Sequence, residues 1–251
     1  MEKELFTFIS RYMTLSDEEK EAIIDLSIFK DFKKGTVLLK EGDISNDYYF
    51  VIKGCLRCYY TVDGEEKTTA FYTESESLVP LCSVNKTPSD QYISCVEDSI
   101  ITVANSNMEK FIFEKFPRFE TLCRLLSEEL LAKNQSAFDS FKHASPEQRY
   151  LNLLETRPDL FQRIPLHQLA SYLGMKPESL SRIRKRLLSQ AKAWFLFFDK
   201  NFIFHGDGYS PKMICEPVKN YDSWANPKKQ NSFSLSFWCY PVKIAIHFFT
   251  V

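Results

Sequence analysis

Hydrophobic positions along the chain change their period several times, and each change predicts a different kind of secondary structure. Residues 16–29 carry apolar side chains at helical spacing, and Ser16 with Glu19 forms a capping box, a motif typical of a helix start. Over residues 30–105 the pattern becomes short β-branched and aromatic runs, and Asp63-Gly64 between two of them favours a tight hairpin turn. The sequence therefore predicts an antiparallel β-sandwich or jelly roll, with strands over residues 36–39, 48–52, 55–62, 67–72, 91–96 and 99–103.

Helical spacing returns at Ser106, and Pro117 suits the first turn of a further helix. From residue 119 to residue 141 a stripe recurs at steps of three and four positions. Such a stripe either packs against its own chain or forms the seam of a parallel coiled-coil dimer. Its length and spacing favour a dimer helix. The contact residues of that helix are then Phe119, Leu122, Leu126, Leu130 and Ala137.

Residues 164–188 have the pattern of two helices joined by a short turn. Gly174 is suited to end the first helix, and Pro177 to begin the second. The apolar positions are Leu166, Leu169, Ala170 and Leu173 in the first helix, and Leu180, Ile183 and Leu187 in the second. The outward positions of the second helix are rich in hydrogen-bond donors. This pattern predicts a helix-turn-helix, and the alternative is a solvated basic face on a core helix.

The charges of the chain are unevenly divided, although its formal net charge is only −1. Residues 1–141 carry a net charge of −9, whereas residues 142–192 carry +6. A compact basic module on an acidic body suggests that the module binds a polyanion.

Composition indicates a cytoplasmic protein. Seven scattered cysteines, an odd number, fit a reducing compartment better than a disulfide framework. No apolar run is long enough to span a bilayer, and the N-terminal residues lack the apolar segment of a secretory signal. We therefore expect no association with a membrane.

Several motifs resemble those of Crp/Fnr transcription regulators, in the short-tailed variety seen in the Bacteroidetes. The resemblance covers residues 10–188. It rests on Gly35, Glu41-Gly42-Asp43, the strings from Tyr49 to Gly54 and from Val96 to Ser99, and the string from Leu169 to Arg182. It implies an α+β fold with an N-terminal jelly roll of the cyclic-nucleotide-binding type, a long dimerisation helix and a C-terminal winged helix-turn-helix.

This resemblance implies a homodimeric, sequence-specific DNA-binding transcription regulator that is not an enzyme. Its expected partners are double-stranded DNA, a second copy of the chain and RNA polymerase. We divide the chain into N-terminal helices with the sensor jelly roll (1–105), a connecting and dimerisation helix (106–142), a DNA-binding domain (143–188) and an atypical aromatic-rich tail (189–251).

The resemblance also assigns DNA contacts on the second helix of the motif. Members of the family contact base edges through a Glu and an Arg, and Glu178 and Arg182 occupy those positions. A carboxylate accepts from cytosine N4, and a guanidinium donates to guanine O6 and N7. Ser179 belongs with these two residues and can also serve a phosphate. The phosphate contacts are Lys176, Ser181, Lys185 and Arg186. A further family Arg is replaced by Pro177, which puts the family's best-known target sequence in doubt.

The sensor half lacks the residues that bind cyclic AMP in relatives. The stretch matching their phosphate cassette, residues 72–92, has no Gly and no Arg, so an unpaired phosphate there would be costly. We therefore expect no cofactor and no cyclic AMP, and either an unknown small ligand or none. The candidate effector pocket consists of Tyr72, Glu76, Leu81, Ser83 and Gln91.

No metal site is expected from the sequence. Cys55 and Cys58 would point to opposite faces of a strand, and the four histidines are dispersed. Two rival functions remain. One is a cyclic-nucleotide or other small-ligand sensor that acts through a protein partner, and it would need the missing cassette. The other is an enzyme on a cupin-like barrel, which would need histidines that the strands of residues 36–103 lack.

The tail beyond residue 188 departs from the resemblance. Residues 194–204 could form a hairpin in the place of a wing, with Lys200 at its tip. A lineage-specific or frame-shifted extension is the alternative.

Overall fold

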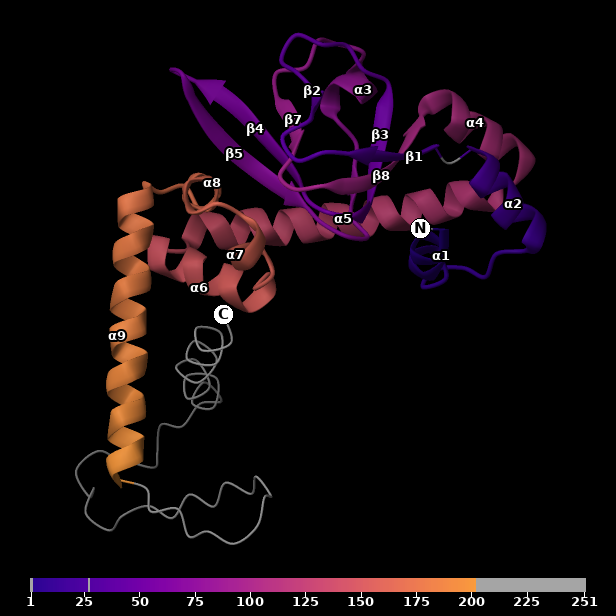
Figure 1. The fold of residues 1–251 in the computed structure, drawn as a ribbon. Helices are drawn as coiled ribbons and strands as arrows, with labels where there is room; N and C mark the ends of the chain where they lie inside the picture. The colour runs from indigo at the N-terminus through magenta and orange to yellow at the C-terminus, as the bar shows by residue number, and fades with distance from the viewer. Residues whose placement is uncertain (1, 27, 202–251) are drawn as a thin grey trace, which may run out of the picture. The chain divides into compact units, whose positions relative to one another are not determined.

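The computed structural model describes residues 2–26 and 28–201, and the chain divides into two compact units at residues 177 and 178 (Figure 1). The helices are α1 (Glu2–Ile9), α2 (Asp17–Leu26), α3 (Leu81–Asn85), α4 (Ser106–Lys115), α5 (Arg118–His143), α6 (Pro146–Thr156), α7 (Leu160–Arg163), α8 (Leu166–Tyr172) and α9 (Pro177–Asn201). The strands are β1 (Ile28–Phe32), β2 (Val37–Leu39), β3 (Asp47–Lys53), β4 (Leu56–Val62), β5 (Glu65–Tyr72), β6 (Ser77–Leu78), β7 (Tyr92–Cys95) and β8 (Ser99–Asn105).

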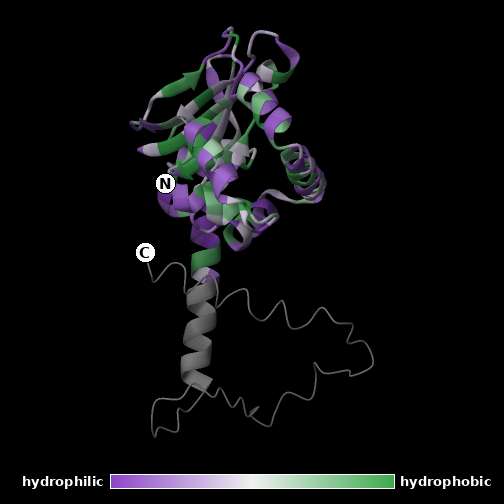
Figure 2. Cartoon of the chain, turned by 90° about the vertical axis from the view of Figure 1, so that its right-hand side faces the viewer, coloured by the Kyte–Doolittle hydropathy of each residue, from purple (hydrophilic) through white to green (hydrophobic). Residues whose placement is uncertain are grey.

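The strands form two antiparallel sheets, which confirms the predicted sandwich. One sheet has the order β1-β8-β3-β6 and the other β2-β7-β4-β5. Each of the six predicted strands is present, and Asp63 and Gly64 take the positive φ angles, 53° and 77°, that the predicted hairpin turn requires. Figure 2 shows hydrophobic residues concentrated along the strands of this sandwich.

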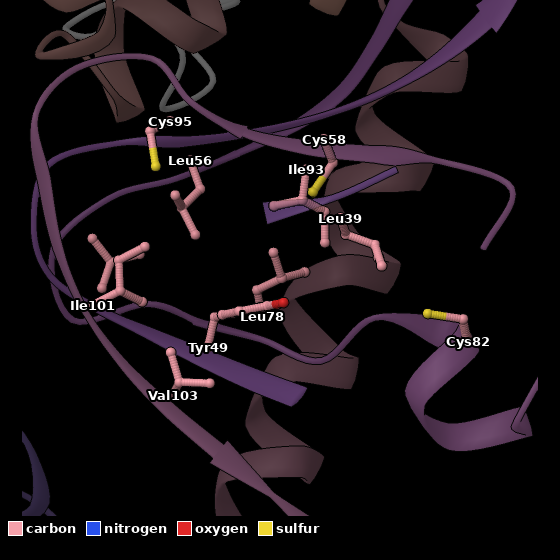
Figure 3. Close-up of a cluster of buried hydrophobic side chains, with 11 residues drawn as sticks. Leu39, Tyr49, Leu56, Cys58, Leu78, Cys82, Ile93, Cys95, Ile101 and Val103 are labelled. Carbon is pink, nitrogen blue, oxygen red and sulfur yellow. The ribbon is translucent and has the colours of Figure 1, made fainter. Parts of the chain in front are cut away.

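The core lies between the two sheets (Figure 3). Leu39, Leu56 and Ile93 reach it from one sheet, and Tyr49 and Ile101 reach it from the other. Leu56, Ile93 and Ile101 have no exposed surface. In β3, β4, β7 and β8 the residues that enter this core are two positions apart, as the alternation of side chains along a strand predicts.

The first predicted helix is confirmed at its start and wrong at its end. The Ser16 backbone N–H donates to the Glu19 carboxylate at 2.7 Å, and the Glu19 N–H donates to the Ser16 hydroxyl at 3.3 Å, as in a capping box. The helix stops at Leu26, whereas the sequence pattern continues to residue 29. Residues 28–32 instead pair with β8, because the backbone groups of that strand offer hydrogen bonds to a neighbour.

Pro117 separates α4 from α5, as predicted, and α5 has 26 residues. Its first turns pack within the chain. Phe119 and Leu122 are buried in a cluster with Ile9 of α1, and partly buried side chains of α2 and α4 surround this cluster. Figure 1 shows α5 running along the sandwich, so this helix connects the N-terminal helices to the region of α6.

The segment predicted as two helices and a turn contains the expected elements. Helix α8 ends before Gly174, which has a φ of 68°, and α9 begins at Pro177. Helix α9 continues to Asn201, so residues 194–201 are helical and the predicted hairpin is wrong for them. The rest of that hairpin and of the tail lies outside the described residues. Across the described ranges, no helix combines the length and apolar character needed to cross a bilayer.

Candidate nucleic-acid interface

Helix α9 separates apolar from polar positions. The three predicted inward residues are buried, with exposures of 0% for Leu180, 8% for Ile183 and 6% for Leu187. The predicted contact residues of the helix are exposed, and so is Lys176 in the turn before it: Glu178, Ser179, Ser181, Arg182, Lys185 and Arg186. The helix therefore presents a hydrophilic face with both donors and an acceptor.

Glu178 and Arg182 lie one turn apart on this face. Four residues of helix correspond to a rise of about 6 Å, which is close to the rise of about 7 Å over two base-pair steps of a duplex. One side chain accepts hydrogen bonds and the other donates them in a planar fork. This pair can therefore recognise two different base edges in one groove.

The turn that leads into α9 is held by an arginine that sequence reasoning assigned no role. Arg149 of α6 donates to the backbone oxygen of Leu173 at 3.1 Å and to that of Ala144 at 3.2 Å. Its guanidinium also lies 3.9 Å from the ring centre of Phe141. Because Leu173 is the last position before Gly174, this arginine satisfies the carbonyl at the end of α8.

The second half of α5 is exposed, unlike the first half. Of the five predicted dimer residues, Phe119 and Leu122 are buried and Leu126 is partly buried in the cluster with α1. Phe119 and Leu122 therefore pack within their own chain, as the alternative reading of the stripe expects, whereas a dimer role for Leu126, Leu130 and Ala137 stays a prediction. Leu130 is 45% exposed, and every residue from 131 to 143 is exposed.

The five candidate effector residues are not gathered around one described cavity. Glu76 accepts from the Thr73 N–H at 2.6 Å, and Ser83 is buried and donates to the Asp47 backbone oxygen at 3.0 Å. Leu81 is 59% exposed, whereas Tyr72 and Gln91 are partly buried. A cavity of about 400 Å³ is lined by other residues, namely 44–47, Lys86 and 105–107.

The cysteines of the sandwich are structural. Cys55, Cys58, Cys82 and Cys95 are buried, and burial raises the pKa of both Cys55 and Cys58 to about 12. Among the described residues, no three His, Cys, Asp or Glu side chains are grouped as metal ligands would be.

Three side chains of helices α6 to α8 and their ends form hydrogen bonds with the sandwich, and sequence reasoning missed all three. They are Arg157, Arg163 and Ser171, whose partners lie between 66 and 109 positions away along the chain. A local pattern carries no signal for such distant partners.

Comparisons with known proteins agree with this architecture. Residues 29–114 match the family model of the cyclic nucleotide-binding domain. No curated protein matches the chain.

Solved structures share its fold at low sequence identity. A CooA variant from Carboxydothermus hydrogenoformans aligns with a TM-score of 0.56 at 16% identity, over 74% of this chain and 85% of that one. FixK2 from Bradyrhizobium japonicum aligns with a TM-score of 0.54 at 15% identity, over 65% and 85%. CLP, described as a c-di-GMP-responsive global regulator of Xanthomonas campestris, aligns with a TM-score of 0.52 at 17% identity, over 70% and 93%. Residues 29–114 therefore resemble a cyclic nucleotide-binding domain, and the chain shares the fold of these solved structures.

Proposed function

We propose that the protein is a homodimeric, sequence-specific DNA-binding transcription regulator. The observation that carries this proposal is the division of α9 into a buried apolar side and an exposed side with Glu178 and Arg182. Helices α8 and α9 form the helix-turn-helix, and α9 is the recognition helix that enters the major groove. The basic excess of residues 142–192 supplies the attraction to the phosphate backbone.

The exposed residues of this motif have two roles. Glu178 and Arg182 read base edges, with Ser179 beside them, and this reading gives the sequence preference. The remaining exposed residues contact phosphates and set the position of the helix on the duplex. They are Lys176, Ser181, Lys185 and Arg186.

The dimer forms through the exposed half of α5. Leu131 is 69% exposed and Phe138, seven positions later, is 56% exposed. Ser127 and Asn134 are also exposed, and the four residues follow steps of four, three and four, the spacing of a coiled-coil seam. Leu130, at 45% exposure, lies beside this seam. Pairing of two copies then sets the two recognition helices about one DNA turn, or 34 Å, apart.

The sensor domain has the fold of a nucleotide-binding domain, but residues 72–92 include no Arg that could pair with a cyclic phosphate. We expect an unknown effector or none. The expected partners of the regulator are RNA polymerase and the operator, and its expected location is the cytoplasm. The chain has no role as an enzyme in this proposal.

Selection of bound sequences from random duplexes tests the proposal directly. The full chain is expected to enrich one motif with two half-sites whose centres lie about one DNA turn apart. Absence of any enriched motif, together with no duplex binding at low salt, would contradict DNA recognition.

A variant pair tests the dimer. Replacement of Leu131 and Phe138 by Ser is expected to raise the dimer dissociation constant at least about tenfold in sedimentation measurements. Leu125→Ser is the control, because Leu125 is 42% exposed on another side of α5. Equal effects of the two changes would place the seam elsewhere.

A further inference from the structure

Arg163, the last residue of α7, is held by three separate turns of the sandwich. Its guanidinium donates to Glu74 at 2.8 and 2.9 Å, to Glu97 at 2.5 and 3.0 Å, and to the backbone oxygen of Gly54 at 2.8 Å. Only 21% of its side chain is exposed. Burial opposes its charge, but the hydrogen bonds that it donates to Glu74 and Glu97 dominate and raise the pKa of Arg163.

The site that receives Arg163 is built by the sandwich itself. Glu74 also accepts the Gly54 N–H at 2.9 Å, so one carboxylate joins the turn to the guanidinium. Gly54 has a φ of 104°, and a Cβ there would lie 2.3 Å from the Ser99 hydroxyl oxygen. The turn therefore requires glycine, and its carbonyl is fixed in the position from which it accepts.

Arg157, at the end of α6, makes a second contact next to the first. It donates to the Thr73 hydroxyl at 2.7 Å, to Glu76 at 3.3 Å and to the Phe71 backbone oxygen at 3.3 Å. Thr73 and Glu76 belong to the stretch of residues 72–92 that the family resemblance matches to the phosphate cassette. Two acidic groups of that stretch, Glu74 and Glu76, are paired with Arg163 and Arg157 of the helical region.

The C-terminal end of α8 makes a third contact. Ser171 accepts the backbone N–H of Thr68 in β5 at 2.9 Å and donates to the backbone oxygen of Glu66 at 3.1 Å. Tyr172 packs edge-on against Phe71, with 5.3 Å between ring centres. Arg57, only 4% exposed, supports the same strand by donating to Thr68. The β4–β5 hairpin therefore holds the helix from which the chain continues into α9.

We infer that Arg163, Arg157 and Ser171 form an internal latch between the sensor sandwich and helices α6 to α8, and that the latched arrangement is the one that binds DNA. This inference rests on the proposed DNA-binding function. By fixing α8 in advance, the latch reduces the conformational entropy that binding must remove, and so favours the complex.

The variant Arg163→Gln of the full chain tests the latch. It keeps a long polar side chain but removes the charge that faces Glu74 and Glu97. Binding to the selected duplex is expected to weaken roughly 2- to 30-fold, the range for substitutions that disturb coupling between sites. Arg118→Gln is the matched control, because Arg118 pairs with the buried Glu19 at 2.5 and 2.6 Å but joins α5 to α2 instead. Its duplex affinity is expected to stay within about twofold of the parent.

Hydrogen exchange at the Thr68 amide gives a readout that needs no DNA. This amide is protected by Ser171 and lies far along the chain from residue 163, so faster exchange in Arg163→Gln reports release of α8. Glu74→Gln is expected to reproduce both effects, and the double variant should weaken binding by less than the product of the two single effects.

Each result has a definite meaning. Unchanged or tighter duplex binding in Arg163→Gln, with faster Thr68 exchange, would overturn the claim that the latched arrangement binds DNA. Unchanged Thr68 exchange would overturn the latch itself. If the parent chain binds no duplex but the exchange result holds, the proposed function fails and the latch stands. Cyclic AMP is expected to leave duplex affinity unchanged, and an increase would contradict the claim that the latch alone sets the DNA-binding arrangement.

Discussion

Arg163 and Arg182 belong to the same basic segment but have different surroundings. Arg163 is mostly buried and bonded to two carboxylates and a carbonyl oxygen, whereas Arg182 is exposed on α9. Arg149 and Arg157 resemble Arg163, because both bind oxygens of their own chain. A basic excess in a sequence therefore overstates the charge available to a polyanion, since part of it stabilises the fold.

The largest effect is expected on the buried side of α9, where Leu180 has no exposed surface. Leu180→Ala should lower the free energy of unfolding by about 2–5 kcal/mol, because it removes buried methyl groups and leaves a cavity. Urea denaturation at fixed protein concentration measures this loss. Leu188→Ala, at a partly buried position, is the control and should cost clearly less; an equal cost would mean that the two sides of the helix are not distinct.

Arg182→Ala tests the exposed arginine of the pair compared above, Arg163 and Arg182. It should reduce discrimination at one base pair in each half-site by roughly 1–3 kcal/mol, with stability unchanged. Affinities for the selected duplex and for duplexes altered at single positions give this number. A uniform loss over all sequences would make Arg182 a phosphate contact.

Lys185→Ala tests whether Lys185 contacts phosphates, which position the helix, and not bases, which give the sequence preference. We expect a slightly weaker affinity for every duplex and a salt dependence whose slope falls by about one. Titrations at several salt concentrations measure the slope. A change in sequence preference would argue that Lys185 reaches a base.

The smallest effect concerns the carboxylates around Arg163. Burial opposes the charge of Glu74, but hydrogen bonds from Arg163 and from the Gly54 N–H outweigh it and lower its pKa from the ordinary 4.5. The carboxylate therefore stabilises the folded chain fully above about pH 4.5, and this contribution is lost as the pH falls through the lowered pKa. The NMR shift of the Gly54 amide should follow this titration, and Glu74→Gln should abolish it. A midpoint at or above pH 4.5 would contradict the contact.

Local patterns predict much of the fold because they report on neighbours in sequence. Alternation along the strands, the Asp63-Gly64 turn and the capping box at Ser16 each depend on residues a few positions apart. Strand β6 has only two residues, Ser77 and Leu78, so it has no period to detect. Strand β1 was missed because Ile28 and Phe29 also fit the end of the preceding helix pattern.

The candidate site likewise has some residues whose positions local spacing predicts and others whose contacts it does not. The positions of Glu178 and Arg182 on one face follow from helical spacing, so the sequence predicts them. Which side of α5 packs within the chain does not follow from spacing, because a stripe looks the same whether a second copy or α1 covers it. The carboxylates that bind Arg163 come from turns distant in sequence, and only the folded sandwich brings them together.

The buried thiols give the sandwich an internal reporter of its own opening. With pKa values near 12, Cys55 and Cys58 hold almost no thiolate at neutral pH, and the thiolate is the form that alkylating reagents attack. Because both thiols are buried, a reagent reaches them only when the domain opens around them. The rate at which a reagent modifies them therefore measures how often this domain opens. Comparison of that rate with and without DNA would show how far duplex binding stabilises the sandwich.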